Sequence, residues 1–317
     1  MRIFKKIQMS RKLIIIISLM MTGLMAEADT NPVAHTGMFV DARAASMGGA
    51  YTAAAFGVEA AYYNPAGLTM FKGREFSSML STGLSFDRNF SFIGVAANPG
   101  FKNRMSAAVA WSNAGWGNMD GYDSNNMPDG DFEVKESSLM LSFAEYVDYL
   151  RLSWGTTIKM LNSDVDGSKA GFGLDIGLLH ELGNFHMFEG VIVGAVVKDF
   201  YSKIDDEKLD AVYKIGVSGY YTPELFTVFD LGFGTGDNSK TTYALGLEYR
   251  YNISDLGPVQ NMSFESADFL PRLGINTGDL YFGFGLNLPK FSLDYAFIPA
   301  PNSEFDTSHR FSLNIPF

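Results

Sequence analysis

Apolar and polar residues alternate at every second position along most of the chain. Between residues 241 and 251, one parity is apolar or aromatic, while the other carries Glu248 and Arg250 among small residues. The same division recurs over 291–297, where the polar parity carries Asp294. A period of two belongs to a β-strand with two different faces, whereas a helix would spread these residues around its whole surface. The pattern therefore predicts an all-β protein.

About fourteen such segments follow Phe71, each close to the roughly 9 to 11 residues that a tilted strand needs to cross a bilayer. A barrel that lies in lipid turns its apolar parity outward and satisfies every backbone group between neighbouring strands. We therefore predict a transmembrane antiparallel β-barrel over residues 72–317. The segments begin near Arg74, Phe90, Arg104, Lys135, Leu150, Gly171, Phe188, Ala211, Phe226, Thr241, Pro271, Leu280, Phe291 and His309.

An even number of strands returns the chain to the side on which it started, so the connections after odd strands are predicted to be extracellular. The longest of these, Asn113 to Val134, is rich in Gly, Asn and Asp, which favours a solvated surface loop. One connection does not fit this scheme, because Asn252 to Leu270 would be a long turn on the periplasmic side.

Both ends of the chain point to export. Residues 1–28 combine basic positions, a short apolar run from Leu13 to Leu24, and a small-x-small pattern at Ala26 and Ala28, which predicts a signal peptide. An anchoring transmembrane helix would need about 20 apolar residues, which is more than this run provides. The last strand ends on Phe317, as in the assembly signal of bacterial outer-membrane barrels. We predict the outer membrane, with a soluble periplasmic sandwich as the alternative.

Composition and charge exclude several classes of function. The formal charge of −11 provides no basic face for nucleic acid, and the absence of cysteine excludes a thiolate zinc site. The four histidines show no metal-ligand spacing. Ser308 and His309 are adjacent on a strand and point to opposite faces, so they cannot share a proton. We expect no metal, no cofactor and no enzyme activity.

Residues 29–71 differ from the rest, because they are rich in Ala and punctuated by Gly. Small residues allow close packing, and Asn64, Pro65 and Ala66 form a turn signal that stops any preceding helix. Two interpretations remain open. The segment is either a linker or soluble cap, or a plug folded into the lumen of the barrel.

One polar set lies on the inward parity of the predicted strands. On the lipid face, an Arg would cost about 2 to 4 kcal/mol at the bilayer midplane, and the acids less, so we expect these side chains to line the lumen. They either form ion pairs that anchor the plug or line a conduction path, and their mixed signs favour ion pairs. The set consists of Asp175, Asp230, Glu248, Arg250, Asp294 and Arg310.

Residues 41–51 and 61–68 resemble the N-terminal hatch of the FadL-like outer-membrane transporters, and in particular their PorV/PorQ branch. Residues 291–297 and 308–313 resemble the end of the same proteins. The resemblance implies a monomeric fourteen-stranded barrel, a hatch over 29–71, and a hatch turn at the three residues Asn64, Pro65 and Ala66.

The resemblance also implies two functions. FadL-type members carry hydrophobic small molecules, above all fatty acids, past the hatch, whereas PorV-type members are outer-membrane partners of type IX protein secretion. We expect hatch-gated transport of a hydrophobic small molecule, with a docking role in secretion as the alternative. The expected partners are outer-membrane lipids, the transported molecule and, in the alternative, secretion-system proteins.

Overall fold

The computed structural model describes residues 38–82, 88–98, 105–122, 127–164, 167–236, 241–253, 267–300 and 307–317. The predicted signal peptide (residues 1–28) and the start of the predicted hatch (29–37) lie outside these ranges. Fourteen long strands dominate the described part of the chain: β1 (Gly73–Thr82), β2 (Arg88–Asn98), β3 (Met105–Tyr122), β4 (Pro128–Val147), β5 (Leu152–Asp164), β6 (Ser168–Phe185), β7 (Phe188–Lys198), β10 (Val212–Tyr220), β11 (Leu225–Gly234), β12 (Thr242–Tyr249), β14 (Asp268–Asn276), β15 (Asp279–Leu288), β16 (Phe291–Ile298) and β17 (Ser308–Pro316).

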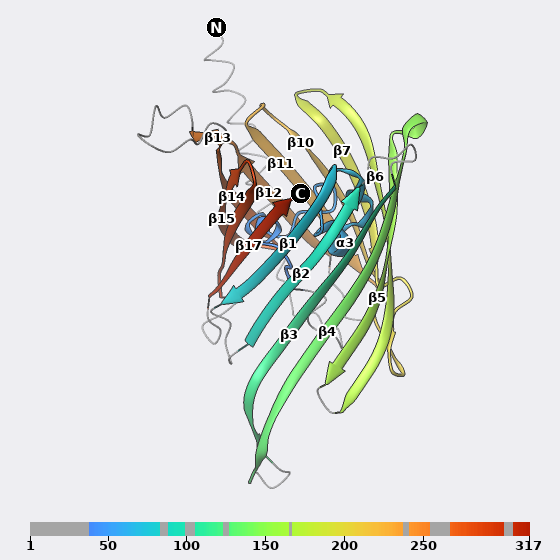
Figure 1. Ribbon diagram of the computed structural model, residues 1–317, viewed down its shortest axis with the longest axis vertical. Coiled ribbons are helices and arrows are strands. Elements are labelled where there is room, and N and C mark those ends of the chain that lie inside the picture. Colours follow the sequence, from blue (N-terminus) through green and yellow to red (C-terminus); the bar gives the residue numbers. More distant parts are fainter. Residues whose placement is uncertain are drawn as a thin grey trace.

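These strands form one closed antiparallel barrel (Figure 1). Each long strand pairs with the next one along the chain, and β1 pairs with both β2 and β17, which closes the sheet. The short strands β8 (Lys203–Ile204) and β9 (Glu207–Lys208) form a hairpin outside this circuit, because β7 pairs directly with β10. The predicted fourteen-stranded barrel is therefore confirmed.

The two faces of the wall follow the sequence alternation. Phe282 and Phe284 on β15 are 46% and 44% exposed, and Leu293 on β16 is 43% exposed, so these side chains point outward. Glu248 and Asp294 lie on the opposite parity and are buried. Apolar side chains thus cover the outer wall, while polar and small side chains face the lumen, as a barrel in lipid requires.

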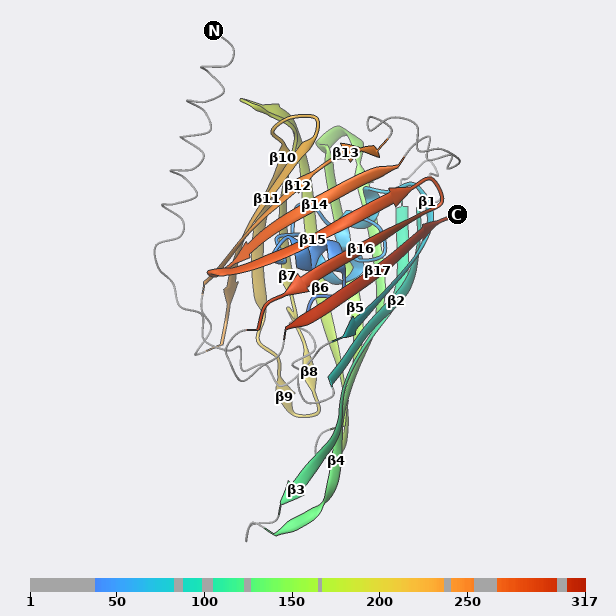
Figure 2. The same cartoon turned by 90° about the vertical axis from the view of Figure 1, so that its left-hand side faces the viewer.

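The connection between β3 and β4 differs from the prediction. Most of the stretch Asn113 to Val134 is paired strand rather than surface loop, since β3 runs on to Tyr122 and β4 starts at Pro128. The Gly, Asn and Asp content predicted a loop, but two paired strands satisfy each other's backbone hydrogen-bonding groups whatever side chains they carry. Figure 2 shows this hairpin, the β3–β4 arm, reaching well beyond the rest of the barrel.

The predicted periplasmic turn Asn252 to Leu270 is shorter than expected at both ends. The short strand β13 (Tyr251–Asn252) pairs with β14, whose first residue is Asp268, and residues 254–266 lie outside the described ranges. Within the described residues, no helix is long and apolar enough to cross a membrane.

Residues 38–71, here called the luminal segment, lie inside the barrel (Figure 2). The segment contains three short helices, α2 (Ala42–Ser46), α3 (Ala60–Tyr63) and the 3₁₀ helix η2 (Pro65–Thr69). Nearly all its side chains are buried, and the rings of Tyr51, Tyr62 and Tyr63 pack edge to face at centroid distances of 5.0 Å. The lumen is therefore filled by the chain itself and forms the hydrophobic core.

Glycines in the wall allow this filling. A Cβ added at Gly177 would lie 2.0 Å from Asn64 Oδ1, and one at Gly274 would lie 2.2 Å from the Gly48 nitrogen. Real Cβ atoms do not approach other atoms so closely, so any side chain at these positions would displace the luminal segment. Similar close approaches to this segment occur at Gly94, Gly155, Gly194, Gly216, Gly246 and Gly283.

We expect Gly177→Leu to lower the free energy of unfolding by about 1 to 3 kcal/mol, because overpacking against Asn64 forces the luminal segment away from the wall. Ile176→Leu, an outward neighbour on the same strand, is the matched control. Urea unfolding of the refolded barrel in lipid vesicles measures both variants. Equal unfolding midpoints for the two would contradict this account of the wall glycines.

Candidate functional site in the lumen

The first helix of the luminal segment is fixed at its start. Asp41 caps α2, its Oδ2 accepting from the Ala44 nitrogen at 2.9 Å, and the Ala42 nitrogen donates to Ser312 Oγ on β17 at 2.9 Å. The helix packs against β14, β15, β16 and β17. This placement directs the Arg43 side chain toward β12.

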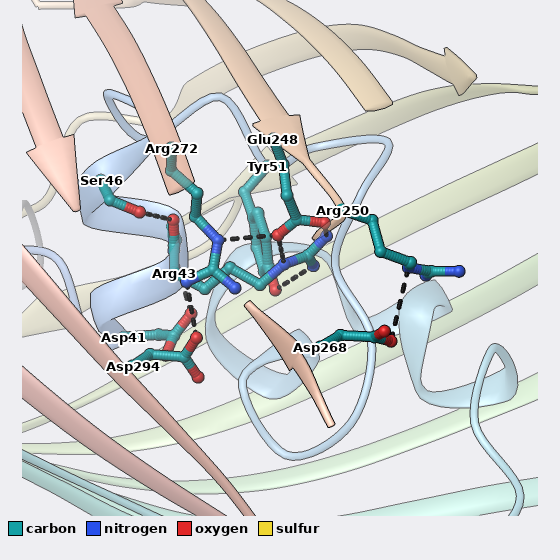
Figure 3. Close-up of polar contacts among 10 residues, drawn as sticks. Asp41, Arg43, Ser46, Tyr51, Glu248, Arg250, Asp268, Arg272 and Asp294 are labelled. Carbon is teal, nitrogen blue, oxygen red and sulfur yellow. Dashed lines mark hydrogen bonds and ion pairs between the residues drawn. The ribbon is translucent and has the colours of Figure 1, made fainter. Parts of the chain in front are cut away.

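Arg43 and Arg272 share the carboxylate of Glu248 (Figure 3). Arg43 Nε and Nη2 donate to Glu248 Oε2 and Oε1 at 2.8 and 3.0 Å, and Arg272 Nε donates to Oε2 at 2.7 Å. Arg272 Nη1 also donates to Asp294 Oδ1 at 2.5 Å. Two cations and two anions thus form a buried, charge-balanced network that joins the luminal segment to β12, β14 and β16.

Aromatic rings surround the Arg43 guanidinium. Its Nη1 donates to the Tyr51 hydroxyl at 2.9 Å, and its Cζ lies 5.5, 5.1 and 5.7 Å from the ring centroids of Tyr51, Phe56 and Phe226. Cations are attracted to ring faces at such distances. Arg43 is therefore held by both ion pairing and ring contacts.

A second anchor joins the luminal segment to β11. Asp230 Oδ2 accepts from the backbone nitrogens of Tyr51 and Thr52 at 2.9 and 2.8 Å, and from Thr52 Oγ1 at 2.7 Å. Farther around the wall, Lys159 on β5 pairs with Asp175 and Asp199 at 2.8 and 2.5 Å. This second ion-pair group lies beside the segment and joins β5 to β6 and to the end of β7.

The turn at Asn64, Pro65 and Ala66 locks the segment against itself and the wall. Asn64 Oδ1 accepts from the Ala66 nitrogen at 3.2 Å, and Asn64 Nδ2 donates to the Thr52 carbonyl at 2.8 Å. Pro65 occupies the first position of η2, where its missing N–H costs nothing. All three residues are buried, and the backbone of Pro65 lies against Gly155 of β5.

A carboxylate pair, Glu59 and Glu75, lies where the start of α3 meets β1. Glu75 on β1 accepts from the Val58 nitrogen at 2.9 Å, and Ser77 donates a short hydrogen bond to Glu59. Burial raises the pKa of Glu59 well above its ordinary value, and the nearby Asp41 and Glu75 carboxylates raise it further. Protonation of Glu59 therefore relieves the repulsion among these acids.

Of the six polar residues expected in the lumen, five are buried there: Asp175, Asp230, Glu248, Asp294 and Arg310. Arg310 lies with its Cζ 5.7 Å from the Phe90 ring centroid. Arg250 is different, because its side chain is 49% exposed and its Nε lies 3.8 Å from Asp268 Oδ2 at the rim (Figure 3). The structure brings Glu248 and Asp294 together, and both contact Arg272.

Four charged residues of the two ion-pair groups were not anticipated: Arg43, Lys159, Asp199 and Arg272. The alternation rule contains the signal for Arg272, since Pro271 and Leu273 flank it on the outward parity of β14. Lys159 has the same signal on β5, between Ile158 and Met160. Arg43 follows no strand pattern, so its partner depends on the fold of the whole segment.

Cavities open on both sides of the luminal segment. One of about 240 Å³ lies where β7 and β11 end and β10 and β12 begin, and Tyr62, Lys198 and Asp230 are among its lining residues. Another of about 190 Å³ lies where β12 ends and β14 begins, beside Arg43 and Arg250. Charged and tyrosine side chains line both. In the described part of the chain, no group of three His, Cys, Asp or Glu residues is placed to hold a metal ion.

No protein-family model and no curated protein sequence matches the chain. Solved structures do match it in fold. The Ralstonia pickettii toluene transporter TbuX superposes with a TM-score of 0.60 at 15% identity, covering 88% of this chain and 98% of that one. The Pseudomonas putida toluene transporter TodX gives 0.56 at 11% identity, covering 86% and 96%. A Pseudomonas aeruginosa FadL homologue gives 0.52 at 10% identity, covering 87% and 97%. The chain therefore shares the fold of these barrels.

We expect Glu248→Ala to destabilise the protein by about 3 to 5 kcal/mol, since the change leaves the Arg43 charge buried without a carboxylate and removes one of the two from Arg272. Hydrogen exchange should rise first in residues 38–71. Arg250→Gln is the control, because its exposed pair with Asp268 contributes about 0 to 1 kcal/mol. If both variants unfold at the same denaturant concentration, the network does not hold the segment.

Proposed function

We propose that this chain is a FadL-like outer-membrane barrel that moves a hydrophobic small molecule through its lumen. Support comes from a fold shared, over nearly their whole length, with structures described as toluene transporters. Apolar side chains on the outer wall support placement in a bilayer. The observation that carries the proposal is a lumen closed by the chain's own residues with a cavity on each side.

The luminal segment acts as the hatch in this proposal. It separates the two cavities, so a molecule that crosses the barrel has to displace part of it. Its turn at Asn64 to Ala66 is held by neutral hydrogen bonds, among them those from Asn64 Nδ2 to the Thr52, Leu178 and Ala195 carbonyls, whereas Arg43 is fixed in a four-residue ion network. Gating is therefore expected to begin at the turn.

The lining of the cavities bears on the class of molecule. In the larger one, the Lys198 ammonium lies 3.8 Å from the Tyr62 ring centroid, and Asp199 and Lys214 lie close by. Polar groups in a pocket fix the orientation of a ligand. This lining favours a molecule with an apolar body and a polar end, as in a fatty acid, over a plain hydrocarbon.

We expect Asn64→Ala to increase uptake several-fold while the barrel still assembles. The change removes the cap on Ala66 and the bond to Thr52, which together contribute about 1 to 3 kcal/mol. Radiolabelled oleate and radiolabelled toluene, supplied in parallel to cells that lack their own FadL-type transporter, measure uptake and separate the two ligand classes.

Asn184→Ala is the matched control, because Asn184 is an exposed residue of the β6–β7 hairpin, outside the lumen. Assembly is checked by the slower mobility of the heat-unfolded barrel on a denaturing gel. Oleate and toluene uptake unchanged by Asn64→Ala in a correctly assembled barrel would overturn the hatch mechanism.

A docking role in protein secretion, as in the PorV/PorQ branch, is the second candidate, and the β3–β4 arm favours it. Beyond the pair Trp116–Val134, the described residues of the arm's two strands pair only with each other, since β2 begins at Arg88, opposite Trp116, and β5 ends at Asp164, opposite Lys135. Isolated two-stranded ribbons are marginally stable in water, and their free edges pair readily with other chains. The sequence from Gly117 to Val134 carries five acidic residues and no basic one, so a partner would be cationic.

For the docking role, we expect that replacing residues 117–133 by an Asn-Gly turn leaves barrel assembly and oleate uptake intact, because the remaining strands keep all their neighbours. Proteins that copurify with the wild-type barrel from its native membrane should then be lost. Mass spectrometry of the two preparations gives the comparison. Retention of the same partners by the shortened barrel would exclude the arm as the docking site.

A further inference from the structure

An apolar groove of about 420 Å³ lies on the outer wall, where the β6–β7 hairpin meets the end of β10 and the start of β11. Its volume falls within the roughly 300 to 1,000 Å³ of small-molecule sites. Most of its lining residues are apolar or aromatic. Its lining residues include Phe188, Val191, Val217, Phe229, Leu245 and Leu247.

Strand pairing is irregular beside the groove. The register between β6 and β7 shifts on both sides of Gly183, and the pairing of β7 with β10 shifts between Ser218 and Tyr220. Such shifts bend a strand away from its neighbour. Gly219 has no side chain to fill the space, and an added Cβ would lie 3.2 Å from Val191 and 3.6 Å from Phe188.

The groove belongs to the lipid-facing surface. Val217 is 41% exposed and has the same outward parity as Ile215 on β10, while Leu245 and Leu247 face outward on β12. Exposed Phe185 extends the apolar surface onto the hairpin above. The groove is therefore open to the same surroundings as the outer wall of the barrel.

Amphipathic rings mark one end of the groove as the level of a membrane interface. Tyr221 packs against Phe188 with ring centroids 5.8 Å apart, and His186 stacks on Phe185 at 5.2 Å. Tyr and Trp rings are enriched where the hydrocarbon region meets the headgroups, and Tyr221 belongs to this class. The groove thus runs from the apolar belt toward a polar rim.

We propose that this groove binds one acyl chain of a bilayer phospholipid, with the headgroup at the level of Tyr221 and His186. The apolar lining, the outward parity and the polar rim each match one part of such a lipid. The inference rests on the proposed membrane location and is independent of transport through the lumen.

Native mass spectrometry of the delipidated full-length barrel, titrated in detergent with palmitoyl-oleoyl-phosphatidylethanolamine, tests the proposal. The wild-type barrel should keep one lipid at collision energies that remove all others. Val217→Trp fills the groove and should weaken the binding of that lipid by at least about tenfold. Phe188→Ala removes a ring that lines the groove and should weaken the binding of the same lipid. This second variant keeps the test valid if the tryptophan variant does not fold.

Val109→Trp is the matched control, because Val109 is an outward valine of similar exposure on β3. It should leave the retained lipid unchanged. Three results would overturn the proposal. All lipids could leave the wild-type barrel at the same collision energy, all variants could retain the lipid equally, or the spectrum could show a dimer mass that Val217→Trp abolishes. A chain that stays soluble without detergent would instead overturn the membrane location, so the two failures are distinguishable.

Discussion

Direct backbone contact between the luminal segment and the barrel wall determines how this molecule is built. At Gly177 and Gly274 the segment lies so close that a single added carbon would overlap it. Because the contact leaves no layer of water, the polar groups of the segment that face the wall need partners there. The hydrogen bonds of Thr52 to Asp230, of Ala42 to Ser312 and of Asn64 to the Leu178 carbonyl follow from this constraint.

The same closeness explains the arrangement of charge. A lone guanidinium in a filled lumen would be strongly unfavourable, so Arg43 is placed against Glu248, which also neutralises Arg272. Asp294 completes the balance on the far side of Arg272. The network thus allows a polar inner wall to coexist with close packing, and it fixes the angular position of α2 in the barrel.

Much of the fold could be predicted from the sequence, because a barrel in lipid imposes one rule on every strand. Alternation located the fourteen strands and put Glu248 and Asp294 on the inner face. It could not locate the ends of the β3–β4 arm, which lie beyond the wall where neither face needs to be apolar. The partner of Arg43 could not be predicted either, since it depends on the path of a non-repetitive segment.

The number of anchors bears on how a molecule would pass under the proposed transport function. The luminal segment is tied to β5, β10, β11, β12, β14 and β17, and each hydrogen bond contributes about 0.5 to 1.5 kcal/mol, those to charged groups more. Withdrawing the whole segment would break all of them and expose the buried tyrosines. Local displacement of the turn breaks the neutral hydrogen bonds of Asn64 to Thr52, Leu178, Ala195 and Ala66 and leaves the charged anchors in place. The geometry therefore favours a hatch that rearranges in place over one that leaves the barrel.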